Sequence, residues 1–356
     1  MMKKFLALVL ALLMALSLVA CGNDAAPADD AAASGDKVVK IGVFEPQTGD
    51  NGAGGKQEIL GMQYANYVQP TVEIGGETYQ VQLEIVDNRT TAENGPSAAA
   101  ELINRNVSVV LGSYGSGVSM AGGDIFAASK VPAIGVSCTN PNVTLLCDYY
   151  WRICFLDPFQ GTVMANYAKE LGATKAYVLT MLGEDYGVGL GKYFVEAFKG
   201  LGGEVIEENF TEGTSDFTAY LNNAVSNGCD VVFAPSSTTY AALIIDQAAS
   251  MNATFPILAG DTWENSAILE AAKGKDIKVY CSTFFDENDD AATAAEFVKG
   301  FKAWLNADGA NLTMMGLPVL DCVGVCGGKL HQLGEWARLS SLKTVAEQMA
   351  ALAWYL

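Results

Sequence analysis

Histidine is almost absent from this sequence, and basic residues are scarce. The chain has one histidine, His331, among 356 residues. Ser-His-Asp and Cys-His catalytic groups and histidine-rich metal sites therefore lack the imidazoles that they need. Lysine and arginine together number 21, against 40 aspartates and glutamates, and the formal net charge is −19. Such an acidic chain is unsuited to binding nucleic acid or anionic lipid by charge.

Cysteine is present, but without the paired spacing of a metal site. Most of the cysteines after residue 100 lie inside apolar runs, so we expect small buried hydrophobic side chains there. These residues are Cys138, Cys147, Cys154, Cys229, Cys281, Cys322 and Cys326. A disulfide, for example between Cys147 and Cys154, stays open because a sequence alone does not assign pairing.

The N-terminal segment has the pattern of a secretory signal peptide. Lys3 and Lys4 precede the apolar run 5–16, which is too short to remain in a bilayer as a span. The segment ends in Leu-Val-Ala-Cys at Cys21, which resembles the bacterial lipobox. The resemblance implies that Cys21 becomes the diacylated N-terminus and anchors the protein to the membrane surface. An ordinary signal peptide with a chance cysteine is the alternative.

Residues 22–36 contain only alanine, aspartate, proline, glycine, serine and asparagine. This composition does not bury a core and predicts a disordered tether. Removing the signal peptide takes away Lys3 and Lys4 and no acid, so the formal charge changes from −19 to −21. About 320 residues remain, enough for two domains or one large one.

Strand-like and helix-like patterns alternate through the first half of the remaining chain. We expect strands at 38–44, 79–86, 107–111 and 131–136, and helices at 57–67, 96–104 and 120–129. Short apolar strands separated by helices predict a parallel sheet with helices on both faces.

The same alternation restarts after Asp157-Pro158. We expect strands at 176–180, 204–209, 230–234, 256–259 and 277–282, and helices at 190–201, 217–226, 240–250 and 266–272. Two successive doubly wound units predict an α/β protein of two lobes. Ligands of such folds bind beyond the carboxyl ends of the strands.

Several segments in this order carry a family resemblance. They are KIGVFEPQTGDNGAGG, GMQYA, a strand ending in Asp87-Asn88, and VVLGSYGSGVSMAGGDIFAASKVPAIGVSCTNPNVT. Together they resemble the type I periplasmic binding proteins, and most of all the leucine, isoleucine and valine receptors of ABC importers. The match runs from about Val38 to about Leu305; no single motif is specific, and the order and spacing carry it.

The resemblance implies two Rossmann-like doubly wound lobes joined by a hinge. The expected divisions are 1–20 signal peptide, 21–37 lipidated cysteine and tether, 38–156 lobe 1, 157–282 lobe 2, and 283–356 return to lobe 1. In lobe 1, the resemblance places the ligand's α-carboxylate on Ser116, Ser137 and Thr139. Hydroxyls beside a helix N-terminus suit an anion, although simple helix capping is the alternative.

In lobe 2, the resemblance identifies Tyr186 as the aromatic that closes over the ligand and Asp261 as the acid that pairs with its α-ammonium group. Trp263 is expected to line the same side of the binding site. The turn 236–240 is expected near the ligand, although the sequence does not fix which of its residues makes the contact. A buried carboxylate needs a cationic partner, which favours an amino acid or another cationic ligand. A solvated turn ahead of the 266–272 helix is the alternative for Asp261.

Two departures from the family pattern stand out. Many relatives carry an aromatic in the first Gly-rich loop, where this chain has Asn51, Ala53, Gly54 and Gly55. A bare loop would leave room for a larger ligand side chain or contribute only backbone, which puts the three branched amino acids in doubt. After Leu305 the match weakens, and the glycines of 320–335 weaken a helix. We expect a truncated or divergent C-terminus with reduced stability.

The predicted function is an extracytoplasmic solute-binding lipoprotein of an ABC importer, on the outer face of a bacterial cell membrane. It is expected to be a monomer, without enzymatic activity, cofactor or metal, whose partners are a small amino-acid-like ligand and the permease subunits. One rival is a sensor of the same fold for amides or other small carboxylates. A second is a secreted hydrolase, since Ser116 in GSYGSG superficially resembles a nucleophile motif with His331 as its sole histidine base.

Overall fold

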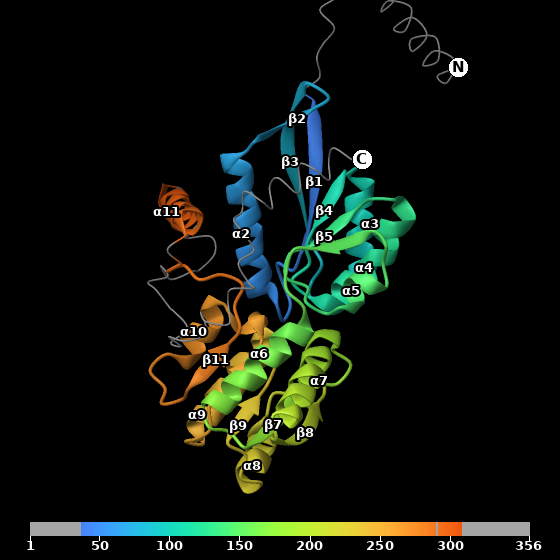
Figure 1. The fold of residues 1–356 in the computed structure, drawn as a ribbon. Coiled ribbons are helices and arrows are strands. Elements are labelled where there is room, and N and C mark those ends of the chain that lie inside the picture. The colour runs from blue at the N-terminus through green and yellow to red at the C-terminus, as the bar shows by residue number, and fades with distance from the viewer. Residues whose placement is uncertain (1–36, 290, 308–356) are drawn as a thin grey trace, which may run out of the picture. The chain divides into compact units, whose positions relative to one another are not determined.

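The computed structural model describes residues 37–289 and 291–307. Several predictions fall outside these residues: the signal peptide, Cys21, the tether, Cys322, Cys326, His331 and the C-terminal segment. The described chain contains two separate sheets, each with helices packed against it (Figure 1). We call the part built on the first sheet lobe 1 and the part built on the second lobe 2.

Lobe 1 holds a six-stranded sheet in the order β2-β3-β1-β4-β5-β6. The strands are β1 Val38–Glu45, β2 Thr71–Ile74, β3 Glu77–Asp87, β4 Val109–Leu111, β5 Ala133–Gly135 and β6 Tyr150–Arg152. All neighbours pair in parallel except β2 and β3, which form an antiparallel hairpin. The chain therefore winds in both directions from β1, as the doubly wound prediction requires.

The helices of lobe 1 lie on both sides of this sheet. They are α2 Gly52–Val68, α3 Gly95–Asn104, α4 Ser116–Ser129 and the short α5 Asn142–Leu145. Helix α2 lies on one side of β1 and the pair α3 and α4 on the other (Figure 1). The core under α3 and α4 includes Phe44, Leu102 and Phe126, each fully buried.

Lobe 2 holds a five-stranded sheet in the order β11-β10-β9-β7-β8, and its neighbouring strands pair in parallel. The strands are β7 Lys175–Met181, β8 Glu204–Phe210, β9 Val231–Phe233, β10 Ile257–Ala259 and β11 Val279–Cys281. The helices are α6 Asp157–Glu170, α7 Asp185–Gly200, α8 Thr218–Ser226, α9 Thr238–Ser250, the 3₁₀ turn η1 Asp261–Trp263, and α10 Ser266–Ala272.

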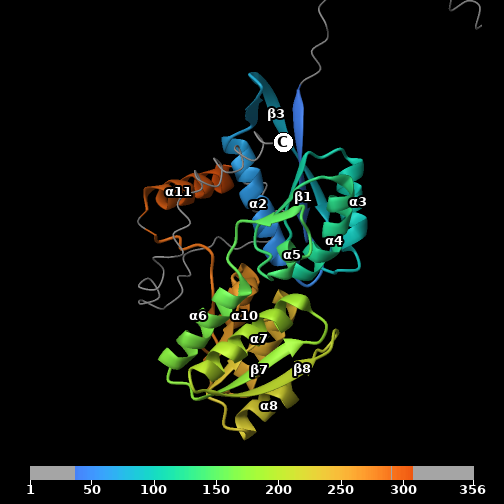
Figure 2. The same cartoon turned by 45° about the vertical axis from the view of Figure 1, so that its right-hand side comes forward.

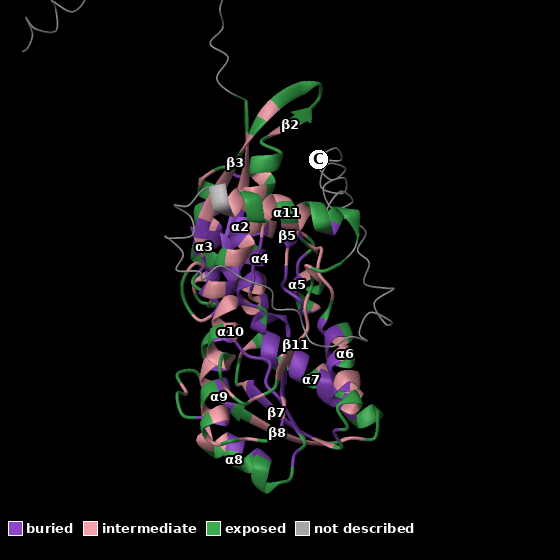
Figure 3. Ribbon diagram, turned by 90° about the vertical axis from the view of Figure 1, so that its left-hand side faces the viewer, coloured by how far each residue is buried: buried purple, intermediate pink, exposed green. Residues whose placement is uncertain are grey.

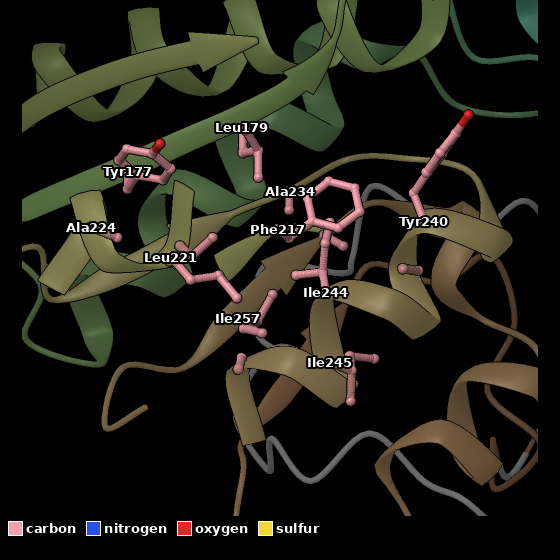
Figure 4. Packing of buried hydrophobic residues seen from close by; sticks show 14 of the residues in the cluster. Tyr177, Leu179, Phe217, Leu221, Ala224, Ala234, Tyr240, Ile244, Ile245 and Ile257 are labelled. Atoms are coloured by element: carbon pink, nitrogen blue, oxygen red, sulfur yellow. The ribbon is translucent and has the colours of Figure 1, made fainter. Parts of the chain in front are cut away.

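The sheet of lobe 2 is buried on both faces, because successive side chains of a strand point to opposite sides. On β7, Ala176 and Val178 belong to the core under α6 and α7, while Tyr177 and Leu179 belong to the core under α8 and α9. Figure 4 shows this second core from close by. Exposed residues gather on β2 and α8, whereas β7 is largely buried (Figure 3).

Helix α11 Ala292–Ala307 follows lobe 2 in sequence but packs against α2 of lobe 1 (Figures 1 and 2). Tyr64 of α2 contacts the rings of Phe297, Phe301 and Trp304, with centroid distances of 5.7, 5.4 and 5.6 Å. These edge-on and tilted contacts are the favourable geometries of aromatic pairs. Helix α11 therefore contacts lobe 1 through Tyr64.

Most predicted strands and helices are present, and four differences stand out. Helix α2 begins at Gly52 rather than 57, because the Gly-rich segment is helical and packed. The β2–β3 hairpin, turned at Gly75-Gly76, was not predicted. Neither were α5 and β6, nor helix α6, which begins at the Asp157-Pro158 pair that the sequence analysis took as a break. Proline suits the first turn of a helix, where its missing N–H has no partner to lose.

The described cysteines are all free thiols: Cys138, Cys147, Cys154, Cys229 and Cys281. Cys138, Cys147 and Cys229 are buried, as the apolar surroundings predict. The disulfide between Cys147 and Cys154 that the sequence left open is not formed, and the Cys147 thiol instead donates to the carbonyl of Gly123.

Alanine substitutions at two helix glycines are expected to change the free energy of unfolding in opposite directions. A Cβ on Gly161 of α6 would lie 2.7 Å from the backbone nitrogen of Phe194 in α7, whereas a Cβ on Gly61 of α2 meets nothing within 4 Å. Gly161→Ala should therefore lower the free energy of unfolding by about 1–3 kcal/mol. Gly61→Ala, its matched control, should raise it by about 0.4–1 kcal/mol. Urea denaturation of both variants measures this, and equal effects would contradict the close packing of α6 on α7.

Candidate functional site

The predicted binding residues lie at the carboxyl ends of the strands in both lobes. Ser137 and Thr139 follow β5, and Ser116 is the first residue of α4. Tyr186 lies in the first turn of α7, and Asp261 opens η1 directly after β10. All five side chains are buried, with at most 4% of their surface exposed. Their positions match the region where doubly wound sheets bind ligands.

On lobe 1, two hydroxyls are buried without hydrogen-bond partners among the described residues. They are the Oγ of Ser137 and the Oγ1 of Thr139. Ser116 accepts a hydrogen bond from the Asn140 N–H at 3.2 Å, and no side chain caps α4. The helix-capping alternative is therefore wrong for Ser116. It is equally wrong for Ser137 and Thr139, because α5 begins at Asn142 and has no side-chain cap.

On lobe 2, Asp261 is held by two neighbours. Its Oδ1 accepts a hydrogen bond from the Tyr186 hydroxyl at 2.9 Å, and its backbone N–H donates to Gln160 Oε1 at 2.8 Å. Only 3% of Asp261 is exposed, so the solvated-turn alternative is wrong. Gln160 comes from α6, so this helix orients the carboxylate. The Thr262 hydroxyl, next in sequence, donates to the Ser236 carbonyl at 2.8 Å.

Trp263 has a mainly structural position. Its indole belongs to the lobe 2 core under α8 and α9, and 2% of it is exposed. The indole Nε1–H donates to the Ser236 carbonyl at 3.1 Å, so its one polar group already has a partner. Trp263 and Thr262 together fix the start of the turn 236–240 against η1. A ligand contact of Trp263 stays a prediction.

Five carboxyl groups surround these residues, and we call them the acidic cluster: Glu45, Glu58, Asp157, Glu184 and Asp261. Burial is the largest cause of a raised pKa in each of them. It raises the pKa of Asp261 to about 6 and those of Glu58, Asp157 and Glu184 to about 7. The pKa of Glu45 lies well above its ordinary value, since the Glu58 carboxyl adds repulsion and a shared hydrogen bond.

Arg152 is the cation that lowers the pKa of Asp157 within this group, and only as a minor effect. Its guanidinium donates to the backbone carbonyls of Cys138 and Asn140, each at 2.8 Å, and to Pro141 at 3.2 Å. Arg152 therefore shapes the loop after β5 rather than neutralising the acidic cluster. No ion pair among the described residues contains a member of the cluster. The site as a whole favours a positively charged group.

Unpartnered buried oxygens converge on the same place. Among the described residues nine buried side-chain oxygens or nitrogens lack a hydrogen-bond partner, and seven of them surround this site. The seven belong to Glu45, Glu58, Tyr114, Ser137, Thr139, Asp157 and Ser237. Ser137 and Thr139 lie near enough to Glu58 and Asp157 to lower their pKa values, yet none of these pairs has standard hydrogen-bond geometry. Buried polar atoms are normally satisfied, so this concentration indicates a polar ligand.

Hydrogen bonds also connect the two lobes around the site. The Asn140 side-chain amide donates to the Asp185 carbonyl at 2.9 Å, joining the loop after β5 to the start of α7. Asn51 Oδ1 accepts from the Thr238 N–H at 3.3 Å, and the Asp50 carbonyl accepts from the Thr239 N–H at 3.3 Å. The first Gly-rich segment of lobe 1 thus contacts the start of α9 in lobe 2.

Several site residues were missed by the sequence analysis. Asp157 and Gln160 lie on α6, whose start the Asp-Pro pair and the acidic first turn could have revealed. Tyr114 lies in the turn after β4, two positions before Ser116, and its ring covers Gly54 so closely that any side chain there would collide with it. The Gly-rich segment therefore does not leave the extra room that its sequence suggested, because Tyr114 fills the space above Gly54.

Among the described residues, no cluster of three or more histidine, cysteine, aspartate or glutamate side chains is arranged to hold a metal ion. No helix in the same residues is long and apolar enough to cross a membrane.

The raised pKa values predict an unusual pH dependence of stability for the ligand-free protein. An acid with a folded pKa near 6–7 and an unfolded pKa near 4 binds its proton more tightly in the folded state, so unfolding becomes easier as pH rises between these values. The melting temperature should therefore rise as the pH falls from about 8 to about 5.5. Asp87, whose pKa is lowered below 3.8, titrates outside this window.

Differential scanning calorimetry at several pH values measures this trend. Repetition at high salt is the control, because salt screens exposed charges and leaves buried groups largely unaffected. Asp261→Asn should flatten the trend and raise the melting temperature at pH 8. A melting temperature that falls on acidification toward pH 5.5 would contradict the buried, uncompensated state of the cluster.

Comparisons with known proteins agree with this fold. The sequence profile of the periplasmic binding protein family matches residues 38–319. The Leu/Ile/Val-binding protein homolog 2 of Brucella abortus is 27% identical over 267 residues, which cover 74% of this chain and 71% of that protein. Among solved structures, the leucine-binding protein LivK of Thermotoga maritima has a TM-score of 0.70 and 34% identity, with 76% of each chain covered. The branched-chain amino acid binding protein LivJ of Streptococcus pneumoniae, solved with isoleucine, has a TM-score of 0.69 and 29% identity, with 76% of this chain and 78% of that chain covered. The chain therefore belongs to the periplasmic binding protein family, with the type I fold, and resembles its branched-chain amino acid binders.

Proposed function

We propose that this protein is the extracytoplasmic solute-binding lipoprotein of an ABC importer, and that it captures a small amino acid between its lobes. The family consists of substrate-binding components of transport systems and implies a location outside the cytoplasm. The observation that carries the proposal is the buried Asp261 carboxylate on lobe 2, without a cationic partner, opposite unpartnered hydroxyls on lobe 1.

The two lobes offer complementary groups for the two charges of an amino acid. The hydroxyls of Ser137 and Thr139 would donate to the α-carboxylate, near the N-terminus of α4 at Ser116, where a negative charge is favourable. Asp261, oriented by Tyr186 and Gln160, would accept from the α-ammonium group. The ammonium group would replace the missing cation, which removes the main unfavourable feature of the buried acid.

Capture would proceed by closure of the lobes around the ligand. A ligand that bonds to both lobes binds the closed arrangement better and so increases its population. The interlobe contacts of Asn140 and Asn51 lie beside the proposed ligand groups and would form as the lobes approach. Closed protein would then dock on the permease subunits, and the family expectation is a monomer.

The geometry gives little support to the hydrolase hypothesis. The Ser116 hydroxyl accepts from the Asn140 N–H, which leaves it facing a backbone amide rather than a base. Within the described residues there is no histidine to act as the base. A sensor of the same fold for amides or other small carboxylates remains the second candidate, and the ligand panel below separates it by its solute.

Binding of amino acids should raise the melting temperature of the protein by mass action. The exported chain, purified in detergent, is screened against the common amino acids and their amides at pH 7.5. Asp261→Asn should weaken binding of the best ligand by roughly a hundredfold or more, since the buried ammonium group of the ligand loses its partner. Isothermal titration calorimetry measures the change.

Asp124→Asn is the matched control, because it makes the same exchange at an exposed position of α4. It should leave the affinity within about twofold. An unchanged affinity in Asp261→Asn, or a well-folded protein that no amino acid or amide stabilises, would rule out the proposed solute class.

Lipid attachment at Cys21 is testable separately. Cys21→Ser should abolish incorporation of labelled palmitate and release the protein from the membrane fraction, because a single substitution removes the acylated thiol. Cys147→Ser, which changes a described buried thiol, should leave labelling intact. Labelling that persists in Cys21→Ser would show that the segment is an ordinary signal peptide.

A further inference from the structure

Tyr114 occupies the place that the bare Gly-rich segment leaves open. Its ring lies against Gly54 of α2, and a Cβ on Gly54 would collide with three carbon atoms of the ring. The backbone N–H of Tyr114 donates to Glu45 Oε2 at 2.7 Å, which fixes the turn after β4. Gly54 and Tyr114 therefore belong together. The aromatic side chain comes from the turn after β4 rather than from the first Gly-rich segment.

The hydroxyl end of Tyr114 is buried and unpartnered. Only 8% of the residue is exposed, and its Oη has no hydrogen-bond partner among the described residues. Its pKa lies well above 10 because of burial first and the negative charges of Asp261 and Glu58 next. The hydroxyl therefore stays protonated and lies within the field of Asp261, the acid proposed to bind the ligand's ammonium group.

Glu58 lies one helical turn after Gly54 on α2 and adds a second unsatisfied oxygen to the same face of this helix. Its Oε2 is buried without a partner, as is Oε1 of the neighbouring Glu45. Two adjacent buried carboxyls favour a shared proton, so the raised pKa values of Glu45 and Glu58 belong to a pair joined by a hydrogen bond. No ion pair among the described residues contains Glu58. Besides the oxygens that share the proton, the pair offers carboxyl oxygens that can accept, and Tyr114 adds a hydroxyl that accepts as well as donates.

A branched aliphatic side chain would leave these oxygens unpaired after closure. An unpaired buried acceptor loses its hydration without compensation, whereas a site built for hydrogen bonding strongly rejects ligands that lack the matching group. N–H groups match both the carboxylate and the phenolic oxygen. Leucine, isoleucine and valine have none in their side chains.

We propose that Tyr114 and Glu58 form a polar subsite that determines specificity, and that the ligand is an amino acid whose side chain ends in N–H donors. Such a side chain is a carboxamide or a basic group. The proposal rests on the proposed capture of an amino acid between the lobes and specifies its side chain. It also explains why Gly54 is needed, since only glycine lets Tyr114 reach this position.

The test is isothermal titration calorimetry of the exported chain with L-glutamine, L-arginine and L-leucine. Glutamine or arginine should bind at least about tenfold more tightly than leucine. Tyr114→Phe removes only the hydroxyl. It should weaken binding of the preferred ligand about 5- to 100-fold, while the affinity for leucine changes by less than about threefold. Tyr177→Phe is the matched control, because it removes a phenol hydroxyl from the lobe 2 core under α8 and α9, outside the proposed site. It should leave the ratios between the affinities for the three ligands unchanged.

Glu58→Gln separates the two side-chain classes, because it removes the charge at nearly constant size. The affinity for a basic ligand should fall more than about tenfold, and the affinity for a carboxamide ligand should fall far less. The melting temperature of ligand-free Tyr114→Phe should not fall, since its hydroxyl has no partner to lose. Tighter binding of leucine, equal losses for all three ligands in Tyr114→Phe, or a lowered melting temperature would overturn the subsite and leave amino acid capture standing. Absence of binding by all three would overturn both.

Discussion

A carboxylate buried without a cation is the constraint on which the rest of this structure depends. Asp261 sits at the end of β10 with 3% of its surface exposed, and its nearest electrostatic neighbours are other acids. Isolated buried charge is strongly unfavourable, and the pKa of Asp261 rises to about 6 in response. Tyr186 and Gln160 supply the hydrogen bonds that keep the group in place at all. The site is thus poised for a cationic group from outside the chain.

The sequence predicted the frame of this molecule well because the frame follows from short-range patterns. Val38–Glu45 and Ile257–Ala259 are short apolar runs ended by polar residues, and they became central parallel strands. Helix boundaries were harder: the glycines at Gly52–Gly55 argue against a helix locally, yet packing against Pro46 and Tyr114 makes the segment helical. Tertiary contacts overrode a weak local preference there.

The site was predictable only where the family pattern supplied the residues. Ser137, Thr139, Tyr186 and Asp261 were named from the resemblance and are indeed buried at the strand ends, although their contact with a ligand stays a prediction. Tyr114 had no such signal, because its importance depends on Gly54, sixty positions earlier, and on a collision visible only in three dimensions. Long-range compensation of this kind leaves no mark in the spacing of either motif.

The interlobe contacts are too weak to close the protein by themselves. The bonds from Asn140, Thr238 and Thr239 are a few neutral hydrogen bonds, each worth about 1 kcal/mol net. In the proposed capture, closure would bring Asp261 toward Glu58 and Tyr114, whose pKa values its negative charge raises. A ligand that supplies positive charge and N–H donors would offset this repulsion and so increase the closed population. The acidic surroundings that make the empty site unfavourable would therefore couple ligand capture to closure, and a neutral aliphatic side chain would relieve only part of that cost.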